Sequence, residues 1–312
     1  MIDLKDAHHH NIDARLKGRL YLSIALTGVV FFAELIGGYL TNSLALMSDA
    51  AHVFMDVFAL ALSAFAIYIS TLPPTEKRTY GLHRVEVFVS FINSFNLFLI
   101  TIFIFYKASR RIISPEPVES TGMLAIAVIG LVVNLMVVLW LKRFSREDMN
   151  IRSAFLHVIG DAAASAGVIV ASLVIRFTGL YIADPLISFA IGLAILYGAI
   201  GIMKDSSHIL LEGVPKEIDL NMVVNDIKGF PGVSSVHSMH IWSICHNVYA
   251  LSAHIDIEPQ ERWRMGEIFN DINERLAGTY HIFYTTLQAE CMGCNSNDTL
   301  RKLSHRERDH AQ

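Results

Sequence analysis

Long apolar stretches alternate with short polar connections over the first two thirds of the chain. Six of these stretches are long enough, at about 20 residues, to cross a hydrocarbon core of ~30 Å. We therefore predict six membrane-spanning helices, over residues Leu20–Leu40, Ser43–Leu72, Val85–Tyr106, Thr121–Leu141, Ser153–Phe177 and Ile182–Met203. The first stretch is too long for a cleavable signal peptide, and no small-residue cleavage pattern separates it from the second.

From Glu212 onward the pattern is that of a soluble domain. Apolar residues recur at helical spacing in two segments, and three other segments are short runs enriched in β-branched residues. In chain order the five segments are Glu217–Lys228 (helix), Val233–Ile244 and Val248–Glu258 (strands), Glu261–Leu276 (helix) and His281–Glu290 (strand). The order αββαβ predicts a small two-layer α/β sandwich.

We therefore expect an α-helical polytopic membrane protein that carries a carboxy-terminal α/β domain. The expected domains are a cytoplasmic amino-terminal segment over residues 1–19, six membrane helices over 20–211, and a metal-binding and dimerisation domain over 212–294. Residues 295–312 are polar and charged, which predicts a disordered tail.

Composition agrees with a membrane protein and excludes several other classes. Of 312 residues, 53% are hydrophobic and 17% are charged, whereas soluble domains carry about 25% charged residues. Three Cys exclude a disulfide-stapled domain, and the high hydrophobic content excludes a disordered chain. A net charge of −4 excludes nucleic acid as a partner.

The distribution of basic residues predicts the orientation in the membrane. One side carries 11 of them: Lys5, Arg15, Lys17, Arg19, Lys77, Arg78, Arg84, Lys142, Arg143, Arg146 and Arg152. The other side carries four: Lys107, Arg110, Arg111 and Arg176. Because the more basic side faces the cytoplasm, both termini are predicted to be cytoplasmic.

Two histidine–aspartate pairs lie within predicted membrane spans. His52 and Asp56 are four residues apart on one helical face, with Asp49 one turn earlier, and His157 and Asp161 repeat the spacing. Each intramembrane carboxylate costs about 2.5–3.5 kcal/mol, and no Lys or Arg lies mid-span to pair with it. The partner is therefore a cation or a proton, unless each Asp is protonated in a local hydrogen bond.

Two imidazoles and two carboxylates form a ligand set that suits tetrahedral Zn²⁺. Ca²⁺ and Mg²⁺ prefer six or more oxygen ligands, so the set disfavours them. Imidazole is a softer ligand than carboxylate, so His52 and His157 favour Zn²⁺, although ligand softness alone does not exclude Cd²⁺ or Co²⁺.

Four motifs occur in a fixed order along the chain: Ser43–His52 with Asp56, Tyr80–Glu86, His157 with Asp161, and Val236–Ser243. Together they resemble the cation diffusion facilitator family, most closely its zinc-transporting branch, over residues 20 to 294. The short loop at Lys142–Arg152 resembles that of bacterial members, which implies a cell (inner) membrane location.

The resemblance implies a homodimer of six-span protomers that is a transporter and not an enzyme. It implies Zn²⁺ as the transported metal, exported from the cytoplasm in exchange for H⁺, with His52, Asp56, His157 and Asp161 as the transport site. A membrane-bound metal sensor or scaffold with the same ligands is the alternative. Carboxylates in mid-membrane favour the transporter, because a sensor does not need them there.

The resemblance also implies cytoplasmic metal ligands at His237, His254 and Glu290. Side chains alternate along a strand, so we expect His237 and His240 on opposite faces and only one of them in a given site. Cys291 and Cys294 form a CxxC pair, which either chelates Zn²⁺ or consists of two idle thiols.

Three further features are expectations with open alternatives. His83 matches a relay metal site of the family, but its neighbours lack the additional ligands, so a surface histidine is the alternative. His8-His9-His10 is a weak metal-collecting tract, a solvated segment or a remnant of an expression tag. Arg84 and Glu212 match a charge interlock near the dimer interface of relatives.

Overall fold

The computed structural model describes residues 26–142 and 149–290. They divide into two compact units. The helical unit comprises the described residues within 1–61 and 93–201, and the sheet unit comprises 62–92 and 202–290. The predicted amino-terminal segment and carboxy-terminal tail, with His8–His10, Cys291 and Cys294, lie outside the described residues.

Within the described residues, five helices are long and apolar enough to cross a membrane. They are α2 (Leu44–Ser70), α3 (Arg84–Ile113), α4 (Ser120–Lys142), α5 (Met149–Thr178) and α6 (Ala183–Leu210). A shorter apolar helix covers Leu26–Thr41. Many large apolar side chains on these helices are exposed, among them Phe32, Phe103 and Tyr197, as expected of a surface that faces lipid. The prediction of a polytopic helical protein is confirmed.

Helix α3 continues seven residues beyond its predicted end at Tyr106. The reason is Arg111, whose guanidinium is mostly buried and donates to the carbonyl oxygen of Asn42 at 2.7 Å. The same group lies 3.5 Å from the carboxylate of Asp184 on α6. A sequence pattern counts this arginine as a loop residue, whereas its partners, Asn42 in the turn before α2 and Asp184 on α6, keep it within the helix.

Asp184 anchors the start of α2. Its buried carboxylate accepts hydrogen bonds from Ser43 Oγ (2.6 Å) and from the backbone N–H groups of Leu44 (2.8 Å) and Ala45 (3.1 Å). These bonds satisfy N–H groups that the first helical turn leaves without partners, and a carboxylate suits the positive end of the helix dipole. The anchor fixes the axial position of α2 and therefore of the polar residues further along it.

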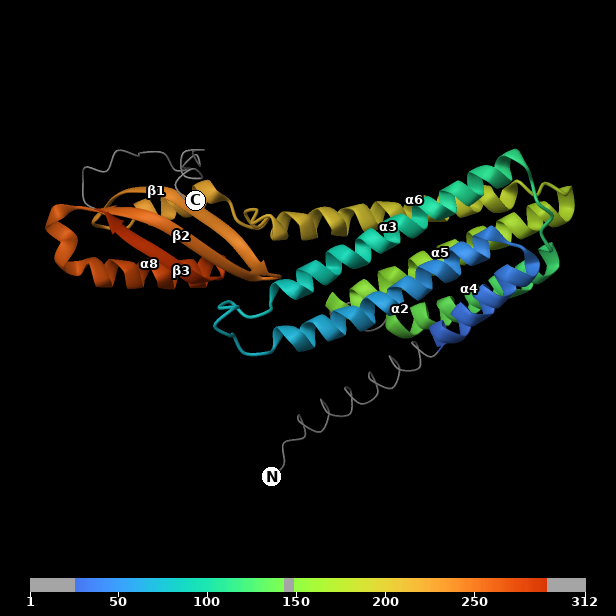
Figure 1. The fold of residues 1–312 in the computed structure, drawn as a ribbon, viewed down its shortest axis with the longest axis horizontal. Coiled ribbons are helices and arrows are strands. Elements are labelled where there is room, and N and C mark those ends of the chain that lie inside the picture. The colour runs from blue at the N-terminus through green and yellow to red at the C-terminus, as the bar shows by residue number, and fades with distance from the viewer. Residues whose placement is uncertain (1–25, 143–148, 291–312) are drawn as a thin grey trace, which may run out of the picture. The chain divides into compact units, whose positions relative to one another are not determined.

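Small side chains pack the helices of the helical unit closely. Figure 1 shows α2, α4 and α5 running side by side. Ala45, Ala127 and Ala171 are almost fully buried in a shared cluster with Leu46 and Met123. Small residues let helix backbones approach, which is the usual basis of helix association in membranes.

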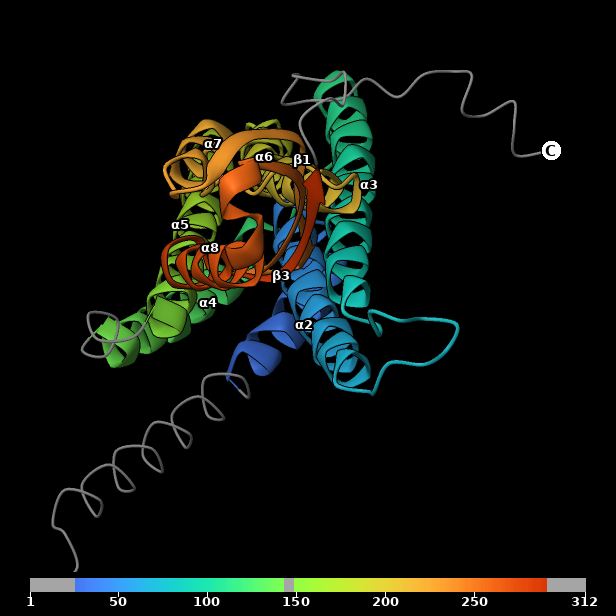
Figure 2. The same ribbon diagram turned by 90° about the vertical axis from the view of Figure 1, so that its left-hand side faces the viewer.

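The sheet unit has the predicted αββαβ order. It consists of α7 (Leu220–Lys228), β1 (Val233–Cys245), β2 (Val248–Ile257), the 3-10 helix η1 (Pro259–Arg264), α8 (Met265–Tyr280) and β3 (Ile282–Glu290). The strand order is β1-β2-β3, with β1 and β2 antiparallel and β2 and β3 parallel. Figure 2 views this unit with α7 and α8 in front.

Helices α7 and α8 supply the apolar cover of the sheet. Ile227 of α7 and Ile272 of α8 are fully buried together with Leu251 and Ile255 of β2. Because side chains alternate along a strand, Ser252, His254 and Asp256 point to the opposite face of β2. The polar chemistry of this unit therefore lies on the face away from the two helices.

Candidate metal centres

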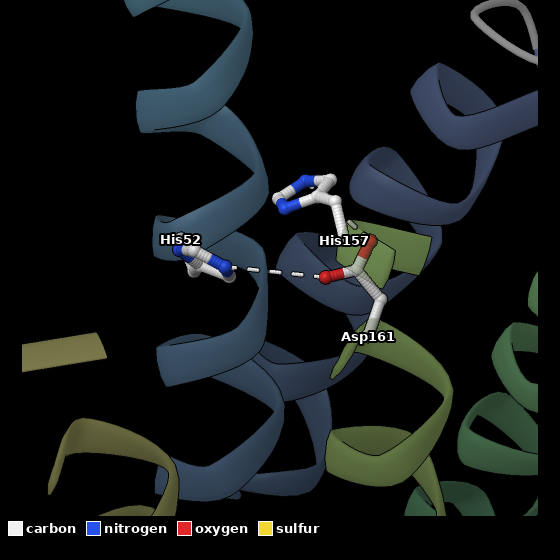
Figure 3. Close-up of side chains that lie close together, drawn as sticks. All are labelled: His52, His157 and Asp161. Atoms are coloured by element: carbon white, nitrogen blue, oxygen red, sulfur yellow. Dashed lines mark ion pairs between the residues drawn. The ribbon is translucent and has the colours of Figure 1, made fainter. Parts of the chain in front are cut away.

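Helices α2 and α5 bring the four predicted intramembrane ligands together. His52 and Asp56 lie one turn apart on α2, and His157 and Asp161 lie one turn apart on α5. Figure 3 shows His52 of α2 directed toward Asp161 and His157 of α5. We call these four residues the helix site.

The ligand atoms of the helix site have the spacing of a small metal centre. Nε2 of His157 lies 3.3 Å from Asp56 Oδ2 and 3.7 Å from Asp161 Oδ2. Nε2 of His52 lies 3.5 Å from Asp56 Oδ2 and 3.9 Å from Asp161 Oδ1. Four tetrahedral ligands at zinc bond lengths of ~2.0–2.1 Å lie about 3.3 Å from one another. One ligand atom each from His52, His157 and Asp161 also fall within 4.8 Å of one another.

The four side chains of the helix site differ in their exposure to solvent. The side chain of His157 is 48% exposed and that of Asp56 is 28% exposed, whereas His52 is at 19% and Asp161 at 9%. The site is therefore open on the side of His157 and Asp56 and closed behind Asp161. The imidazole of His157 is the most accessible of the four ligands, whereas the Asp56 Oδ2 that faces both histidines is itself buried.

A second group of buried polar residues lies near Asp161, and sequence analysis did not assign it to a site. Glu34 and Asp49 are each 2% exposed, and both carboxylates interact electrostatically with Asp161. A side chain at Gly130 would contact both Glu34 and Ser165, so this glycine leaves the room that the two polar groups occupy. The sequence signal was present, since Glu34 is the lone acidic residue in the first apolar stretch.

The sheet unit holds a second cluster of potential ligands on its outer face. His237 of β1 is paired with His254 of β2, and their ring centroids are 5.3 Å apart. Glu290 of β3 lies 3.4 Å from His237 Nε2, and its other carboxylate oxygen is hydrogen-bonded to His254 Nδ1. One ligand atom from each residue falls within 4.8 Å of the others. We call these three residues the sheet site.

Asp256 lies beside the sheet site and was not singled out from the sequence. Its Oδ2 is 3.9 Å from His237 Nε2 and accepts a hydrogen bond from Ser235 Oγ. The spacing His254-Ile255-Asp256 could have predicted this placement, because residues two apart on a strand share a face.

The expectation that His237 and His240 face opposite sides of the sheet is wrong. A bulge between them shifts the register, so that His237 pairs with His254 and His240 pairs with Ser252. Ser238 within this bulge has a positive φ of 49°. One extra residue shifts the alternation by one position, so both histidines lie on the outer face. Only His237 joins the sheet site, because His240 lies beyond the bulge.

The other predicted residues occupy separate places. His83 lies just before α3 and forms no cluster of three potential metal ligands with other described residues. Arg84 and Glu212 make an ion pair at 3.0 Å with both side chains exposed. Cys245 is a buried free cysteine, and burial raises the pKa of its thiol, which disfavours a thiolate ligand there.

Comparison with known proteins decides the family. The cation efflux transmembrane domain matches residues 20–211, and the cytoplasmic domain of cation efflux proteins matches residues 215–291. The chain belongs to the cation efflux, or cation diffusion facilitator, family.

Relatives resemble the chain over nearly its whole length. The metal cation efflux system protein CzcD of Cupriavidus metallidurans is 38% identical, over 95% of this chain and 94% of the relative. A cadmium, cobalt and zinc/H(+)-K(+) antiporter of Bacillus subtilis is 37% identical over 97% and 98%. The zinc transporter ZitB of Escherichia coli is 35% identical over 90% and 89%.

One of the similar solved structures is a single domain. It is the metal-bound C-terminal domain of the CzcD transporter from Cupriavidus metallidurans, at 30% identity and a TM-score of 0.22. The similarity covers 23% of this chain and 99% of that chain.

Family membership settles the broad activity. The chain is a multi-pass membrane protein and a divalent metal cation efflux transporter, not an enzyme. Family membership does not identify the transported metal, the coupling ion or the residues that bind them. The geometry of the two sites bears on all three.

Proposed function

We propose that this transporter exports Zn²⁺ from the cytoplasm in exchange for H⁺, with the helix site as the transport site. The observation that carries the proposal is the convergence of two histidines and two aspartates from α2 and α5. Within the described residues, their ion pairs are only with one another. A dication supplies the positive charge that two apposed carboxylates in a low-dielectric setting need.

The donor set favours Zn²⁺ as the transported metal. Two imidazole nitrogens and two carboxylate oxygens suit tetrahedral zinc and offer too few oxygens for Ca²⁺ or Mg²⁺. The names of relatives that are zinc transporters support this choice. The Bacillus relative named for cadmium, cobalt and zinc indicates which other metals could compete.

Proton coupling follows from ligand chemistry. A histidine binds metal only when neutral and an aspartate only when ionised, so arrival of zinc displaces protons from the site. On the opposite side of the membrane, protons compete the metal off. The empty site returns protonated, because bare carboxylates facing each other in low dielectric repel strongly.

The exposure of the ligands suits alternating access. His157 and Asp56 face the open side, which we assign to the cytoplasm together with both chain termini. A change in the packing of α2 against α5 would close this side and open the path past Asp161. We further propose a homodimer in the bacterial inner membrane, with a domain boundary near residue 212 and a cytoplasmic zinc-binding role for the sheet site.

Transport by purified protein in liposomes tests the proposal. An imposed proton gradient is expected to drive Zn²⁺ toward the acidic side, and zinc movement alone is expected to produce an opposite pH change reported by a trapped dye. Zn²⁺, Cd²⁺, Co²⁺ and Mn²⁺ should be run in parallel, with Zn²⁺ expected to move fastest.

Two results would contradict the proposal. Zinc flux that causes no pH change and ignores an ionophore would favour a passive channel. Zinc binding without any flux, in vesicles where the protein is folded, would favour the metal sensor.

A further inference from the structure

A cavity of about 840 Å³ lies within the sheet unit, apart from both metal centres. One wall is the segment over residues 77–85, which connects α2 to α3 and includes the start of α3. The opposite wall is formed by outer-face residues of the sheet, among them His240, Trp242 and Ser252. Neither the transport cycle nor the sheet site uses this cavity.

The charge of the cavity wall is strongly positive. Lys77, Arg78 and Arg84 line it with a single acidic residue, Glu212, which leaves a net charge of +2. Glu212 is engaged with Arg84 at 3.0 Å. Within the described residues, neither Lys77 nor Arg78 makes an ion pair, so both cations are available to an anionic ligand.

The basic residues stand on an ordered turn. The backbone N–H of Arg78 donates to the carbonyl of Thr75 at 2.9 Å, and the N–H of Thr75 donates back at 3.2 Å. The N–H of Gly81 then donates to the carbonyl of Arg78 at 2.9 Å, with a φ of +73° at Gly81 that suits glycine. The backbone that carries these charges is therefore ordered, which lowers the entropic cost of binding.

The cavity also lies where membrane helices end. Helix α2 ends at Ser70, α3 begins at Arg84 and α6 ends at Leu210, so its wall follows directly on three candidate spans. Leu72 and Tyr80 near these ends are exposed. Exposed apolar and aromatic side chains next to basic residues are typical of the level at which lipid headgroups lie.

We propose that this cavity binds the phosphate-bearing headgroup of an anionic phospholipid. Lys77 and Arg78 contact the phosphate, and the indole N–H of Trp242 and the hydroxyl of Ser252 serve as neutral donors. Basic pockets at the cytoplasmic ends of membrane helices recognise such headgroups by this chemistry. The inference is independent of the metal and of the transport site.

Two other ligands fit the cavity less well. A metal ion would need clustered donors, but among the described residues the two histidines in the wall, His83 and His240, belong to no cluster of three potential metal ligands, and Glu212 is held by Arg84. A soluble phosphate ester fits the charges, but it has no apolar group to contact the apolar part of the wall, which includes Leu82, Val214 and Ile241.

Energy transfer from Trp242 to a labelled lipid measures the binding directly. The full-length protein, with Trp140→Phe and Trp263→Phe so that Trp242 is the only donor, is placed in phosphatidylcholine nanodiscs. Acyl-chain dansyl phosphatidylglycerol or dansyl phosphatidylcholine is then titrated in. We expect transfer to saturate with the anionic lipid at roughly 25-fold lower mole fraction, because each of the two basic residues near an anionic lipid contributes about fivefold.

Matched variants separate this cavity from general charge effects. Lys77→Gln with Arg78→Gln should lose the preference for phosphatidylglycerol, whereas Lys204→Gln with Lys228→Gln, which removes two exposed charges elsewhere, should keep it. Glu212→Gln should strengthen the preference, since it removes the one negative charge from the wall. Thermal unfolding of each variant reports whether it is folded.

The test can also overturn the assignment. Equal transfer to both lipids in the parent protein, or equal loss in both double variants, would refute a specific site. If glycerol 3-phosphate competed as effectively as unlabelled phosphatidylglycerol, the ligand of the cavity would be a soluble phosphate ester and not a lipid. For the parent protein alone, raising the salt concentration from about 50 mM to about 0.5 M should weaken the preference, because screening shortens the range of the attraction.

Discussion

The two candidate metal centres use similar ligands on different backbones. The helix site draws its four residues from α2 and α5, whose backbone hydrogen bonds are internal to each helix. The sheet site draws His237, His254 and Glu290 from three strands that are hydrogen-bonded to one another in register. Only side-chain packing holds the first set of ligands together, whereas a continuous ladder holds the second.

This difference suggests a division of roles. Two helices can shift against each other without breaking a backbone hydrogen bond, so ligands on separate helices can open toward either side of a membrane. Strand-borne ligands cannot separate without breaking the ladder. We therefore expect ion movement at the helix site and stable binding at the sheet site, and the following predictions test that contrast.

The largest effect is expected at the helix site. Asp161→Asn keeps the shape of the side chain but removes the negative charge that a cation needs. Zinc flux in liposomes should fall by more than about 100-fold, because even outer-shell partners of metal ligands contribute 10–100-fold. Asp56→Asn should behave in the same way, whereas Asp205→Asn, on an exposed position of α6, should transport normally. Near-normal flux in either helix-site variant, with the protein folded, would remove the assignment.

Metal choice should also depend on the helix site. His52→Asp replaces a nitrogen donor by a third carboxylate and should raise the ratio of Cd²⁺ to Zn²⁺ flux by about tenfold, or ~1.4 kcal/mol in relative affinity. His246→Asp, on the exposed turn between β1 and β2, is the matched control. An unchanged ratio would show that His52 does not set selectivity.

The sheet site should affect stability more than flux. Zinc at a hundredfold excess over its dissociation constant should stabilise the sheet unit by about 2.7 kcal/mol, measured by hydrogen exchange in β1 to β3 of the full chain. Glu290→Gln should lose most of this gain and change the flux by less than about threefold. Glu274→Gln, at an exposed position of α8, should keep both the stabilisation by zinc and the normal zinc flux. If Glu290→Gln abolished flux as Asp161→Asn does, the contrast between the sites would fail.

The smallest effect concerns the rigidity of the sheet unit. Asp226 of α7 accepts hydrogen bonds from Tyr280 Oη at 2.9 Å and Arg275 Nε at 3.1 Å, and both hold the pKa of Asp226 below its ordinary value. Because the pKa is lower in the folded state, the ionised Asp226 stabilises the fold at pH values above its unfolded-state pKa of about 3.9. This stabilisation is lost as the pH falls through the folded-state pKa.

Asp226→Asn should therefore lower the unfolding temperature slightly at neutral pH and make no difference in strong acid. Calorimetry at several pH values measures this difference. Zinc flux should be unchanged, since the bond lies within the sheet unit. A destabilisation that persists in acid would mean that packing, and not charge, joins α7 to α8.

Much of this protein could be predicted because its signals are local. Spans of apolar residues follow from length alone, and His52 with Asp56 share a face because residues four apart on a helix always do. The order αββαβ also follows from periodicity. The end of α3 at Ile113 could not be predicted, because it depends on Arg111 finding Asn42 and Asp184 on other segments.

Sequence by itself determined that polar pairs lie within apolar spans, and the charge balance required a cation or a proton as their partner. Tertiary structure decided which pairs meet, because the approach of α2 to α5 depends on packing between residues about 100 positions apart. It also decided the face of His240, since a bulge at Ser238 reverses the alternation that a regular strand imposes. Finally, it brought the buried Glu34 and Ser165 to the same place beside Gly130, an approach that no spacing along the chain encodes.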